Sequence, residues 1–452
     1  MRTKLAVAIV AIGVVLGMSG VLQAQFTRAR DPGLRGGPAG AGGPLADLSD
    51  AEQEMFTAGR AEFSEEETVL EGVGPRFNFV GCKGCHVHPD VGGTSPPTNP
   101  LFRVTGDLGF TGNVVPSFIT PHGPIREVRY RYKSDGTRDG GVHALFVITG
   151  HPDAGGCNLQ QENFESQFRA GNVTFRIPSP VFGAGLIEQI PDSAIVANVA
   201  TQASTKSALG IRGHANRMNV SGTANRNGND GTVSRFGWKA QNKSLTLFSG
   251  EAYNVEMGIT NELFQSERDE TASCQFATVP NDGVPSVHQI SAIANFANFQ
   301  RFLAPPEPSP DTPGGAASIG RGRTKFVDVG CALCHTPALR TNKVSSVAAL
   351  RDQPVNLYSD LVLHHMGAGL ADDILQGDAT GGEFRTAPLW GLGQRIFLLH
   401  DGRTTDLVEA IQAHRSTGTS KYGPSEANGV VDRYNQLRES DKLDLLNFLR
   451  SL

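Results

Sequence analysis

Two five-residue stretches, Cys82–His86 (CKGCH) and Cys331–His335 (CALCH), decide how this chain folds. Each has the spacing C-x-x-C-H, in which two thiols can form thioether bonds to the vinyl groups of a haem while the adjacent histidine is held beneath the iron. Zinc sites usually combine ligands from separated pairs, and a dithiol redox motif has no need of a histidine directly after its second cysteine. The two copies therefore predict two covalently bound c-type haems and a redox protein. The attachment cysteines are Cys82, Cys85, Cys331 and Cys334, and the iron ligands are His86 and His335.

The bulk composition limits the possible partners and the style of the fold. The 452 residues are enough for two or three domains with substantial cores. The net charge of −5 provides no broad basic surface, so nucleic acid is not an expected partner. The 54 glycines and 26 prolines, together with only 39% hydrophobic residues, predict long loops rather than dense regular structure.

The N-terminus has the pattern of an export signal. Arg2 and Lys4 supply a positively charged start, residues 5–21 are apolar, and Ala24 completes a usable cleavage site. The pattern predicts a signal peptide over residues 1–24, with an uncleaved membrane anchor as the alternative. Because c-type haem is attached outside the cytoplasm, the expected location is the bacterial periplasm.

The two motifs divide the mature chain into haem-binding units of unequal size. Gly59 and Phe63 lie on a predicted helix, capped by Ser49, ahead of the first motif, and Gly322 and Phe326 occupy the same relation to the second. We expect a mainly α fold with two cytochrome c-like haem domains, the first enlarged by irregular loops and short β-strands. The predicted order is a Gly/Pro-rich linker at 25–47, an N-terminal haem domain with insertions at 48–303, a Pro-rich linker at 304–318 and a C-terminal cytochrome c domain at 319–452.

Local patterns predict further elements inside these units. The β-branched and aromatic content of residues 142–149 and 172–177 predicts two strands, whereas the polar residues 215–232 predict a loop. Ser440 is expected to cap a terminal helix over residues 441–452, with Leu443, Leu446 and Leu449 on one face. That helix should pack across the helix that opens the second unit.

Two cysteines remain once the motifs are set aside. They are Cys157 and Cys274. In an oxidising compartment two spare cysteines are more often bonded than free, which favours a disulfide between them. The alternative is two buried thiols that never meet.

Four segments of the chain resemble the bacterial di-haem c-type oxidoreductase family, whose members are described as peroxidase-like or thiol oxidoreductase-like. They are residues 74–100, 236–259, 358–369 and 383–414. More remotely, the chain is similar to di-haem cytochrome c peroxidases and to the di-haem enzyme that matures methylamine dehydrogenase. The resemblance covers nearly all of the mature chain and implies a redox enzyme.

The resemblance implies roles for two residues beyond the motifs. In the superfamily a tryptophan lies between the haems, and Trp238 is its counterpart here; an ordinary buried tryptophan is the alternative. A distal glutamate follows in an E-M-G element, which Glu256 matches, and it would carry protons during peroxide cleavage. Burial should raise its pKa towards the working range. The glutamine that usually accompanies it has no counterpart, because Leu247 and Phe248 occupy that region.

The sequence favours an open coordination position on the first haem. The related peroxidases have a displaceable histidine some way after the first motif, but this chain has none between His88 and His122. His88 is too close to His86 to reach the other haem face. The histidines that could return in space are His122, His143, His151 and His214.

For the second haem, the resemblance implies a sixth ligand from the helix that follows an H-D-G element. Counted from residues 400–402, that position is His414, which would give a low-spin bis-histidine haem of low potential. Met366 is the next candidate, and His364 or His365 comes after it.

The surroundings of the H-D-G element suggest contacts with haem propionates. His400 and Asp401 are expected to tie the helix start to the propionates, and Arg385 and Arg403 are further candidates. Relatives often hold calcium in the segment before H-D-G. Residues 395–397 lack the usual threonine and proline, so the sequence does not support a calcium prediction.

Three functions are compatible with these patterns. The leading one is an exported di-haem oxidoreductase that reduces hydrogen peroxide at the haem of His86, with electrons arriving at the haem of His335 from a small periplasmic protein such as a cytochrome c or a cupredoxin. The second is oxidation of a protein or organic substrate. The third is a two-haem electron carrier without catalytic activity, in which both irons have six ligands. An open iron on the first haem would separate the enzymes from the carrier.

Overall fold

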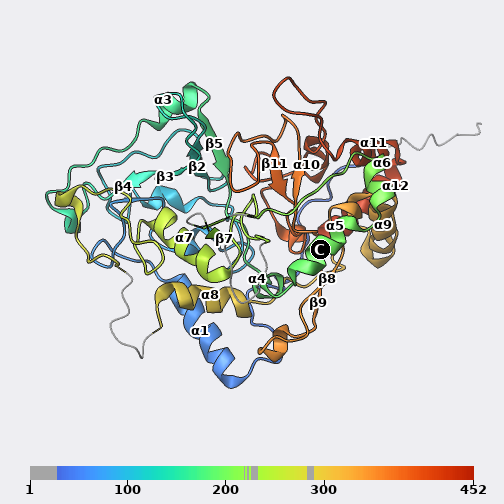
Figure 1. Cartoon of the computed structure of the whole chain (residues 1–452), viewed down its shortest axis with the longest axis horizontal. Helices are drawn as coiled ribbons and strands as arrows, with labels where there is room; N and C mark the ends of the chain where they lie inside the picture. The colour runs from blue at the N-terminus through green and yellow to red at the C-terminus, as the bar shows by residue number, and fades with distance from the viewer. Residues whose placement is uncertain (1–27, 218, 221–222, 225–232, 282–289) are drawn as a thin grey trace, which may run out of the picture.

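Helices are the main regular structure of this chain, and irregular segments connect them (Figure 1). The computed structural model describes residues 28–217, 219–220, 223–224, 233–281 and 290–452. These residues form twelve α-helices, while the strands are only two to four residues long. None of the described helices has the length and apolar character needed to cross a membrane. The predicted signal peptide lies outside the described residues.

The N-terminal unit is built on a crossing between α1 (Asp50–Ser64) and α8 (Ala292–Phe302). Ser49 caps α1 as predicted, because its side chain accepts a hydrogen bond from the Glu52 backbone while the Glu52 carboxylate accepts one from the Ser49 N–H. Gly59 lies at the crossing, where a Cβ atom would clash with the backbone of α8. The ring of Phe63, one turn later, packs 6.1 Å from the ring of His86.

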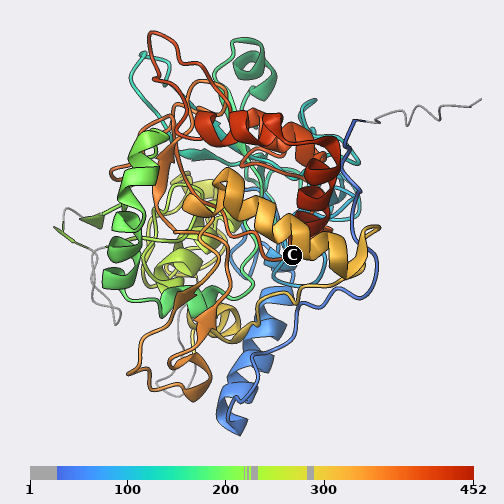
Figure 2. The ribbon, with the colours of Figure 1, turned by 90° about the vertical axis from the view of Figure 1, so that its right-hand side faces the viewer.

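The C-terminal unit repeats this arrangement with α9 (Gly315–Val329) and α12 (Glu439–Ser451), which lie side by side in Figure 2. Gly322 lies where α12 crosses, and a Cβ atom there would clash with the carbonyl oxygen of Asp444. Phe326 then packs 6.4 Å from the ring of His335. The predicted packing of the terminal helix across the opening helix is therefore present.

The start and the buried face of this terminal helix differ from the prediction. Helix α12 begins at Glu439, so its N-cap is Arg438 and not Ser440. Glu439 and Asp441 place negative charge in the first turn, which stabilises a helix N-terminus without a serine cap. Leu443 is 42% exposed; the buried face is formed by Leu445, Leu446, Phe448 and Leu449.

The remaining helices surround these two crossings. They are α2 (Cys82–Cys85), α3 (Phe164–Arg169), α4 (Ala184–Glu188), α5 (Asp192–Ala200), α6 (Ala203–Ala208), α7 (Leu245–Met257), α10 (Leu407–Ala413) and α11 (Asn428–Gln436). Helix α7 packs against α8, which brings it beside the first motif. The C-x-x-C residues of the second motif form a single 3₁₀ turn directly after α9.

The strands form small antiparallel sheets. The largest has three strands in the order β3 (Val142–His143), β2 (Glu127–Tyr130) and β5 (Val173–Arg176). The two-stranded sheets pair β1 (Arg76–Phe77) with β4 (Phe146–Val147), β6 (Asn219–Val220) with β7 (Thr223–Ala224), β8 (Leu339–Arg340) with β9 (Pro354–Val355), and β10 (Leu363–His365) with β11 (Glu383–Arg385).

Two local predictions on strands and loops need correction. Residues 142–149 form two strands with different partners, because the N–H of Leu145 donates to the side chain of Asn78 and the ladder breaks there. The predicted loop at 215–232 contains the β6–β7 pair, and the rest of it is described only in part.

The segments at the predicted linkers pack closely on the second unit. Asp31 forms an ion pair with the buried Arg450 of α12 at 2.5 Å. The buried Arg35 donates to the carbonyl oxygen of Glu307 at 3.2 Å. Helix α9 starts at Gly315, within the stretch predicted to be a proline-rich linker.

Candidate functional site

Each C-x-x-C-H motif lies at the wall of its own cavity. The first cavity has a volume of about 130 Å³, and its lining includes Cys82, Cys85 and His86. The second has a volume of about 230 Å³, and its lining includes Cys331, Cys334 and His335. Both cavities therefore combine two thiols and one imidazole at one wall.

The two motif histidines are oriented in the same way. Nδ1–H of His86 donates to the carbonyl oxygen of Gly93 at 3.1 Å, and Nδ1–H of His335 donates to that of Tyr358 at 3.0 Å. Such a bond fixes the tautomer and leaves Nε2 free to bind a metal ion. Burial lowers the pKa of each histidine to about 4, which keeps both rings neutral.

The four motif cysteines are reduced in the structure and face buried surroundings. Burial raises the pKa of the Cys85 thiol and raises that of Cys331 to about 12, so neither is a reactive thiolate. Two neutral thiols beside a neutral, pre-oriented imidazole fit a haem, because its vinyl groups and its iron need these two kinds of donor. The residues at both cavities therefore fit a haem group.

Glu256 lies in the wall of the first cavity, near the end of α7. Burial, with smaller contributions from the nearby carboxylates of Glu127 and Glu251, raises the pKa of its carboxyl group to about 8, against the opposing charge of Arg129. The group can therefore gain and lose a proton near neutral pH inside the cavity that contains His86.

Trp238 lies in the walls of both large cavities. Its indole Nε1–H donates to the carbonyl oxygen of Ile177 at 2.9 Å, which fixes the ring. The edge of His400 approaches it at 6.4 Å between ring centres, and His400 in turn stacks on Phe384 at 4.2 Å. A single polarisable ring thus lies between the two motifs.

Among the described histidines, only His86 lies in the wall of the first cavity. His88 donates from Nε2 to the carbonyl oxygen of Gln394 at 2.7 Å, which ties the first motif to the C-terminal unit. His143 is held by Glu162 and Asp139. His214 is held by Glu383, and His122 and His151 also lie away from the cavity wall.

Three of the candidate sixth ligands, His414, Met366 and His364, lie in the wall of the second cavity. His414 lies in its wall and donates from Nδ1 to the carbonyl oxygen of Ala410 at 2.7 Å, so its Nε2 is free. It is close enough to His335 for its charge to lower the pKa of that residue. Met366 lies in the same wall and is buried.

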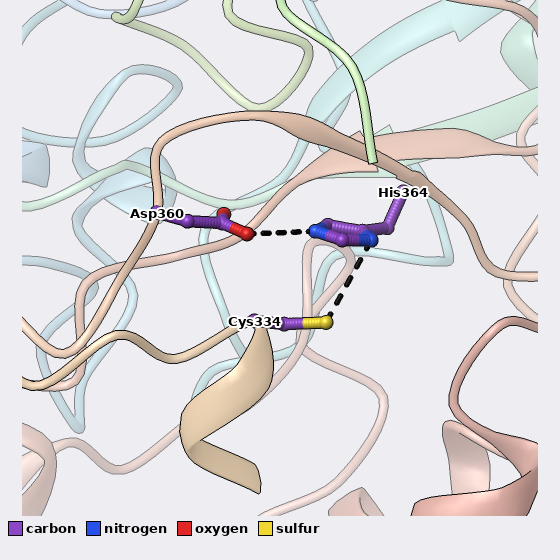
Figure 3. Close-up of side chains that lie close together, drawn as sticks. All are labelled: Cys334, Asp360 and His364. Atoms are coloured by element: carbon purple, nitrogen blue, oxygen red, sulfur yellow. Dashed lines mark hydrogen bonds and ion pairs between the residues drawn. The ribbon is translucent and has the colours of Figure 1, made fainter. Parts of the chain in front are cut away.

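The two lesser candidates for this position, His364 and His365, interact with other groups. His364 is held between two carboxylates, with Nε2 2.9 Å from Asp360 and Nδ1 2.8 Å from Glu426. Figure 3 shows this ring between Asp360 and the sulfur of Cys334. His365 interacts through Nε2 with the carbonyl oxygen of Gly423 and is not part of the cavity wall.

The structure also places glutamines in the first cavity that sequence reasoning missed. Gln241 and Gln300 lie in its wall, and Nε2 of Gln300 donates to Ser249 of α7 at 2.9 Å. Gln300 belongs to α8, so it reaches Glu256's helix from a neighbouring element. The sequence does not show that Gln300 is close to this helix, because 44 residues separate Gln300 from Glu256; the packing of α8 against α7 does.

The two spare cysteines, Cys157 and Cys274, are joined by a disulfide. It links the loop after β4 to the segment that follows α7. Thr149 is one of its neighbours, and neither cysteine lines the two cavities that contain the motifs. The bond therefore belongs to the scaffold of the first unit.

Comparison with known families gives one match. The family model described as "Di-haem oxidoreductase, putative peroxidase" matches residues 128–452. The chain belongs to this di-haem oxidoreductase family. The match includes the second motif, Trp238 and Glu256, whereas the first motif precedes it.

Two solved structures are similar to parts of this di-haem oxidoreductase. The hydrazine synthase of Kuenenia stuttgartiensis is 16% identical with a TM-score of 0.26, over 45% of this chain and 60% of that one. A MauG-like protein associated with microbial copper homeostasis is 16% identical with a TM-score of 0.29, over 51% of this chain and 76% of that one. The chain thus spans somewhat less than two thirds of the hydrazine synthase chain. Comparison with curated proteins finds no match.

Membership of the family means that this oxidoreductase carries two haem groups. The two cavities at the motifs are the places where the described residues could hold them. Arg385 lies in the wall of the second cavity, as expected for a propionate partner. Arg403 instead pairs with Asp401 at 2.6 Å and does not line this cavity, so the geometry does not support it as a partner.

Proposed function

We propose that this protein is an exported di-haem c-type cytochrome oxidoreductase that reduces hydrogen peroxide. One haem would be attached through Cys82 and Cys85 and the other through Cys331 and Cys334. Each would occupy a cytochrome c-like domain, formed by residues 48–303 and 319–452. The repeated crossings α1–α8 and α9–α12, each with a glycine at the contact and a phenylalanine beside the motif histidine, support this assignment.

One observation carries the assignment of peroxidase activity. A half-buried carboxyl group, that of Glu256, whose pKa is raised to about 8, lies in a cavity where His86 is the sole described histidine. An electron carrier fills both axial positions of its iron and needs no proton-handling group beside it. A peroxidase needs an open position and a group that moves protons.

When bound, the haems supply one-electron chemistry, with electrons entering at the C-terminal site and peroxide reduced at the N-terminal site. Glu256 accepts a proton from one oxygen of hydrogen peroxide and delivers it to the other oxygen, which leaves as water, while two electrons from the donor protein and two protons from solvent convert the remaining oxygen to a second water. Gln241 and Gln300 supply amide groups in the same wall that can hydrogen-bond peroxide. Trp238 provides the aromatic contact between the two cavities.

The second site has the features of an electron-entry site. His335 and His414 both line it with Nδ1 bonded to a backbone carbonyl, so each can offer Nε2 to one metal ion. Met366 is the competing ligand in the same wall. With both axial positions filled, this site would exchange electrons without binding peroxide.

The partners and the location follow from this scheme. We infer export to the periplasm from the signal-like residues 1–24, and the disulfide between Cys157 and Cys274 agrees with an oxidising compartment. A small periplasmic cytochrome c or cupredoxin would donate the electrons, and hydrogen peroxide or a similar oxidant would accept them.

Replacement of Glu256 tests the proposed activity. Glu256→Gln retains the shape of the side chain but cannot carry the proton. We expect peroxide consumption to fall by about 10²–10⁴-fold while both haems are retained. In the wild type the rate should rise with pH through a pKa of about 8, because the carboxylate form begins the transfer, and this step should vanish in the variant.

The control for this experiment is Glu54→Gln, an exposed glutamate on α1. It should leave the rate and its pH dependence unchanged. A Glu256→Gln protein that consumes peroxide as fast as the wild type would rule out the proposed role of this residue. Absence of peroxide consumption in the wild type would leave the electron carrier, or oxidation of another substrate, in its place.

A further inference from the structure

Two buried arginines, Arg385 and Arg395, lie in the wall of a small cavity between the two motifs. This cavity has a volume of about 40 Å³, and Trp238 also lines it. Both arginines line the second large cavity as well. Their guanidinium groups therefore lie where the small cavity meets the site of Cys331–His335.

Neither arginine forms an ion pair with a described residue, and the carboxylate of Asp360 acts on Arg385 only through its charge. Arg385 donates from Nε to the carbonyl oxygen of Gly237 at 2.8 Å and from Nη1 to that of Thr386 at 3.4 Å. For the side chain of Arg395, no hydrogen bond or ion pair to any described residue is found. Burial lowers the pKa of each arginine to about 10; for Arg385 the charge of Arg395 contributes to this lowering and the charge of Asp360 opposes it.

A third arginine in the wall of the small cavity shows how a buried guanidinium group is usually neutralised. Arg235 is equally buried, but its guanidinium pairs with Asp192 and donates to the carbonyl oxygen of Ile190. Arg385 and Arg395 have no such carboxylate, and the wall of the small cavity contains none. A buried charge without a partner destabilises a protein strongly, because the lost hydration of the charge is not replaced. Arg385 and Arg395 are therefore placed to bind an anion that the polypeptide does not supply.

The geometry favours a carboxylate as that anion. A guanidinium group offers two parallel N–H donors that match a carboxylate, and two such groups side by side match two carboxylates. A calcium ion would meet two positive charges and no carboxylate in this wall. The shared wall with the second cavity places the free donors beside the ligand of that cavity.

We propose that Arg385 and Arg395 form a clamp for the two propionate carboxylates of the haem held at Cys331–His335, an inference that rests on the proposed function. The clamp is fixed to its surroundings at two points. The backbone N–H of Arg385 donates to the carbonyl oxygen of Trp238 at 2.9 Å. The carbonyl oxygen of Gln394, the residue before Arg395, accepts a hydrogen bond from His88, two residues after the first motif.

The clamp has a consequence for electron transfer. Two positive charges beside the second haem stabilise the added electron of the reduced state, so they raise its reduction potential. They also lie next to Trp238, which contacts both haem cavities. Loss of one guanidinium would leave a propionate unpaired and would favour the oxidised haem.

Redox titration of the holoprotein tests the clamp. We expect Arg395→Gln and Arg385→Gln to shift the reduction equilibrium of the second haem about tenfold toward the oxidised form, which is ~59 mV for a one-electron couple. Arg395→Lys retains the charge without the forked donor and should shift it less. Arg403→Gln is the matched control, since Arg403 pairs with Asp401 outside this cavity, and it should shift nothing.

The results distinguish a failure of the clamp from a failure of the proposed function. Two bound haems with unchanged potentials in both glutamine variants would overturn the clamp alone, whereas a wild type without two haems would overturn the proposed function as well. A wild-type potential that follows the concentration of acetate at constant ionic strength would show that the site takes a free carboxylate, and would also overturn the clamp.

A second measurement applies if the glutamine variants do not fold. Wild-type protein prepared with haem carrying ¹³C in its propionate carboxyl groups can be examined by infrared difference spectroscopy on reduction. Paired propionates stay ionised and give label-sensitive carboxylate bands. Bands of protonated carboxyl groups alone would contradict the clamp.

Discussion

Burial affects Glu256 more than any neighbouring charge does. Desolvation is the main reason that its pKa rises to about 8, and Glu127 and Glu251 add to the effect. The E-M-G element identified this residue in the sequence, but its depth depends on how α7 packs beside α8, which no local pattern contains. Gln300 was missed for the same reason, because α8 brings it to the cavity from outside the expected region.

The raised pKa of Glu256 makes the stability of the protein depend on pH. The folded carboxyl group holds its proton more tightly than the unfolded one, so its contribution is full below the unfolded pKa of 4.5 and is lost as the pH rises through about 8. The loss can reach about 5 kcal/mol. Glu256→Gln cannot titrate and should lose less stability over this range in denaturant unfolding. Equal pH dependence in the two proteins would show that the carboxyl group is not buried as described.

Trp238 should control the exchange of electrons between the two haems. Trp238→Phe keeps an aromatic ring in the path and should slow the exchange, and Trp238→Leu should slow it more. The rate is measured by rapid reduction of the second haem followed by the absorption of the first. Trp390→Phe is the control, because Trp390 lines only the small cavity among the three central cavities. Rates unaffected by either change at Trp238 would exclude it as the bridge.

At the scale of elements, the sequence predicted the helices better than the strands. The cap at Ser49 and the glycine and phenylalanine ahead of each motif identified α1 and α9, because caps and helical spacing are local signals. Residues 142–149 read as one strand, yet their two halves pair with β2 and β1. Strand pairing depends on distant partners, so local β-propensity could not show the break.

The crossing between α9 and α12 can be tested by replacing one glycine of α9 at the contact and, as a control, another glycine of α9 that faces open space. Gly322→Ala places a Cβ against the carbonyl oxygen of Asp444 and should destabilise the protein by about 1–3 kcal/mol. Gly320→Ala faces open space and should stabilise it by about 0.5–1 kcal/mol. Thermal unfolding of the two holoproteins measures the difference. If Gly322→Ala were as stable as Gly320→Ala, α9 and α12 would not be in close contact.

At the scale of the whole molecule, the functional arrangement depends on contacts between the two units. The motifs alone predicted two haem sites, but not that Trp238 lies in both cavity walls or that Arg395 lies in the wall of the second without an ion pair to any residue that the structure describes. His88, three residues after Cys85, bonds to Gln394 of the other unit. Such contacts join residues about 300 apart in the sequence, and they become visible only when both units are folded together.

The central claim is that the haem of the first motif has an open position and that the haem of the second does not. Electronic absorption and low-temperature EPR spectra of the oxidised protein, recorded before and after one equivalent of hydrogen peroxide, test it most directly. We predict one high-spin and one low-spin ferric haem, with the high-spin signal lost when peroxide is added. Two low-spin haems that do not respond to peroxide, even after half-reduction, would contradict the account and leave an electron carrier.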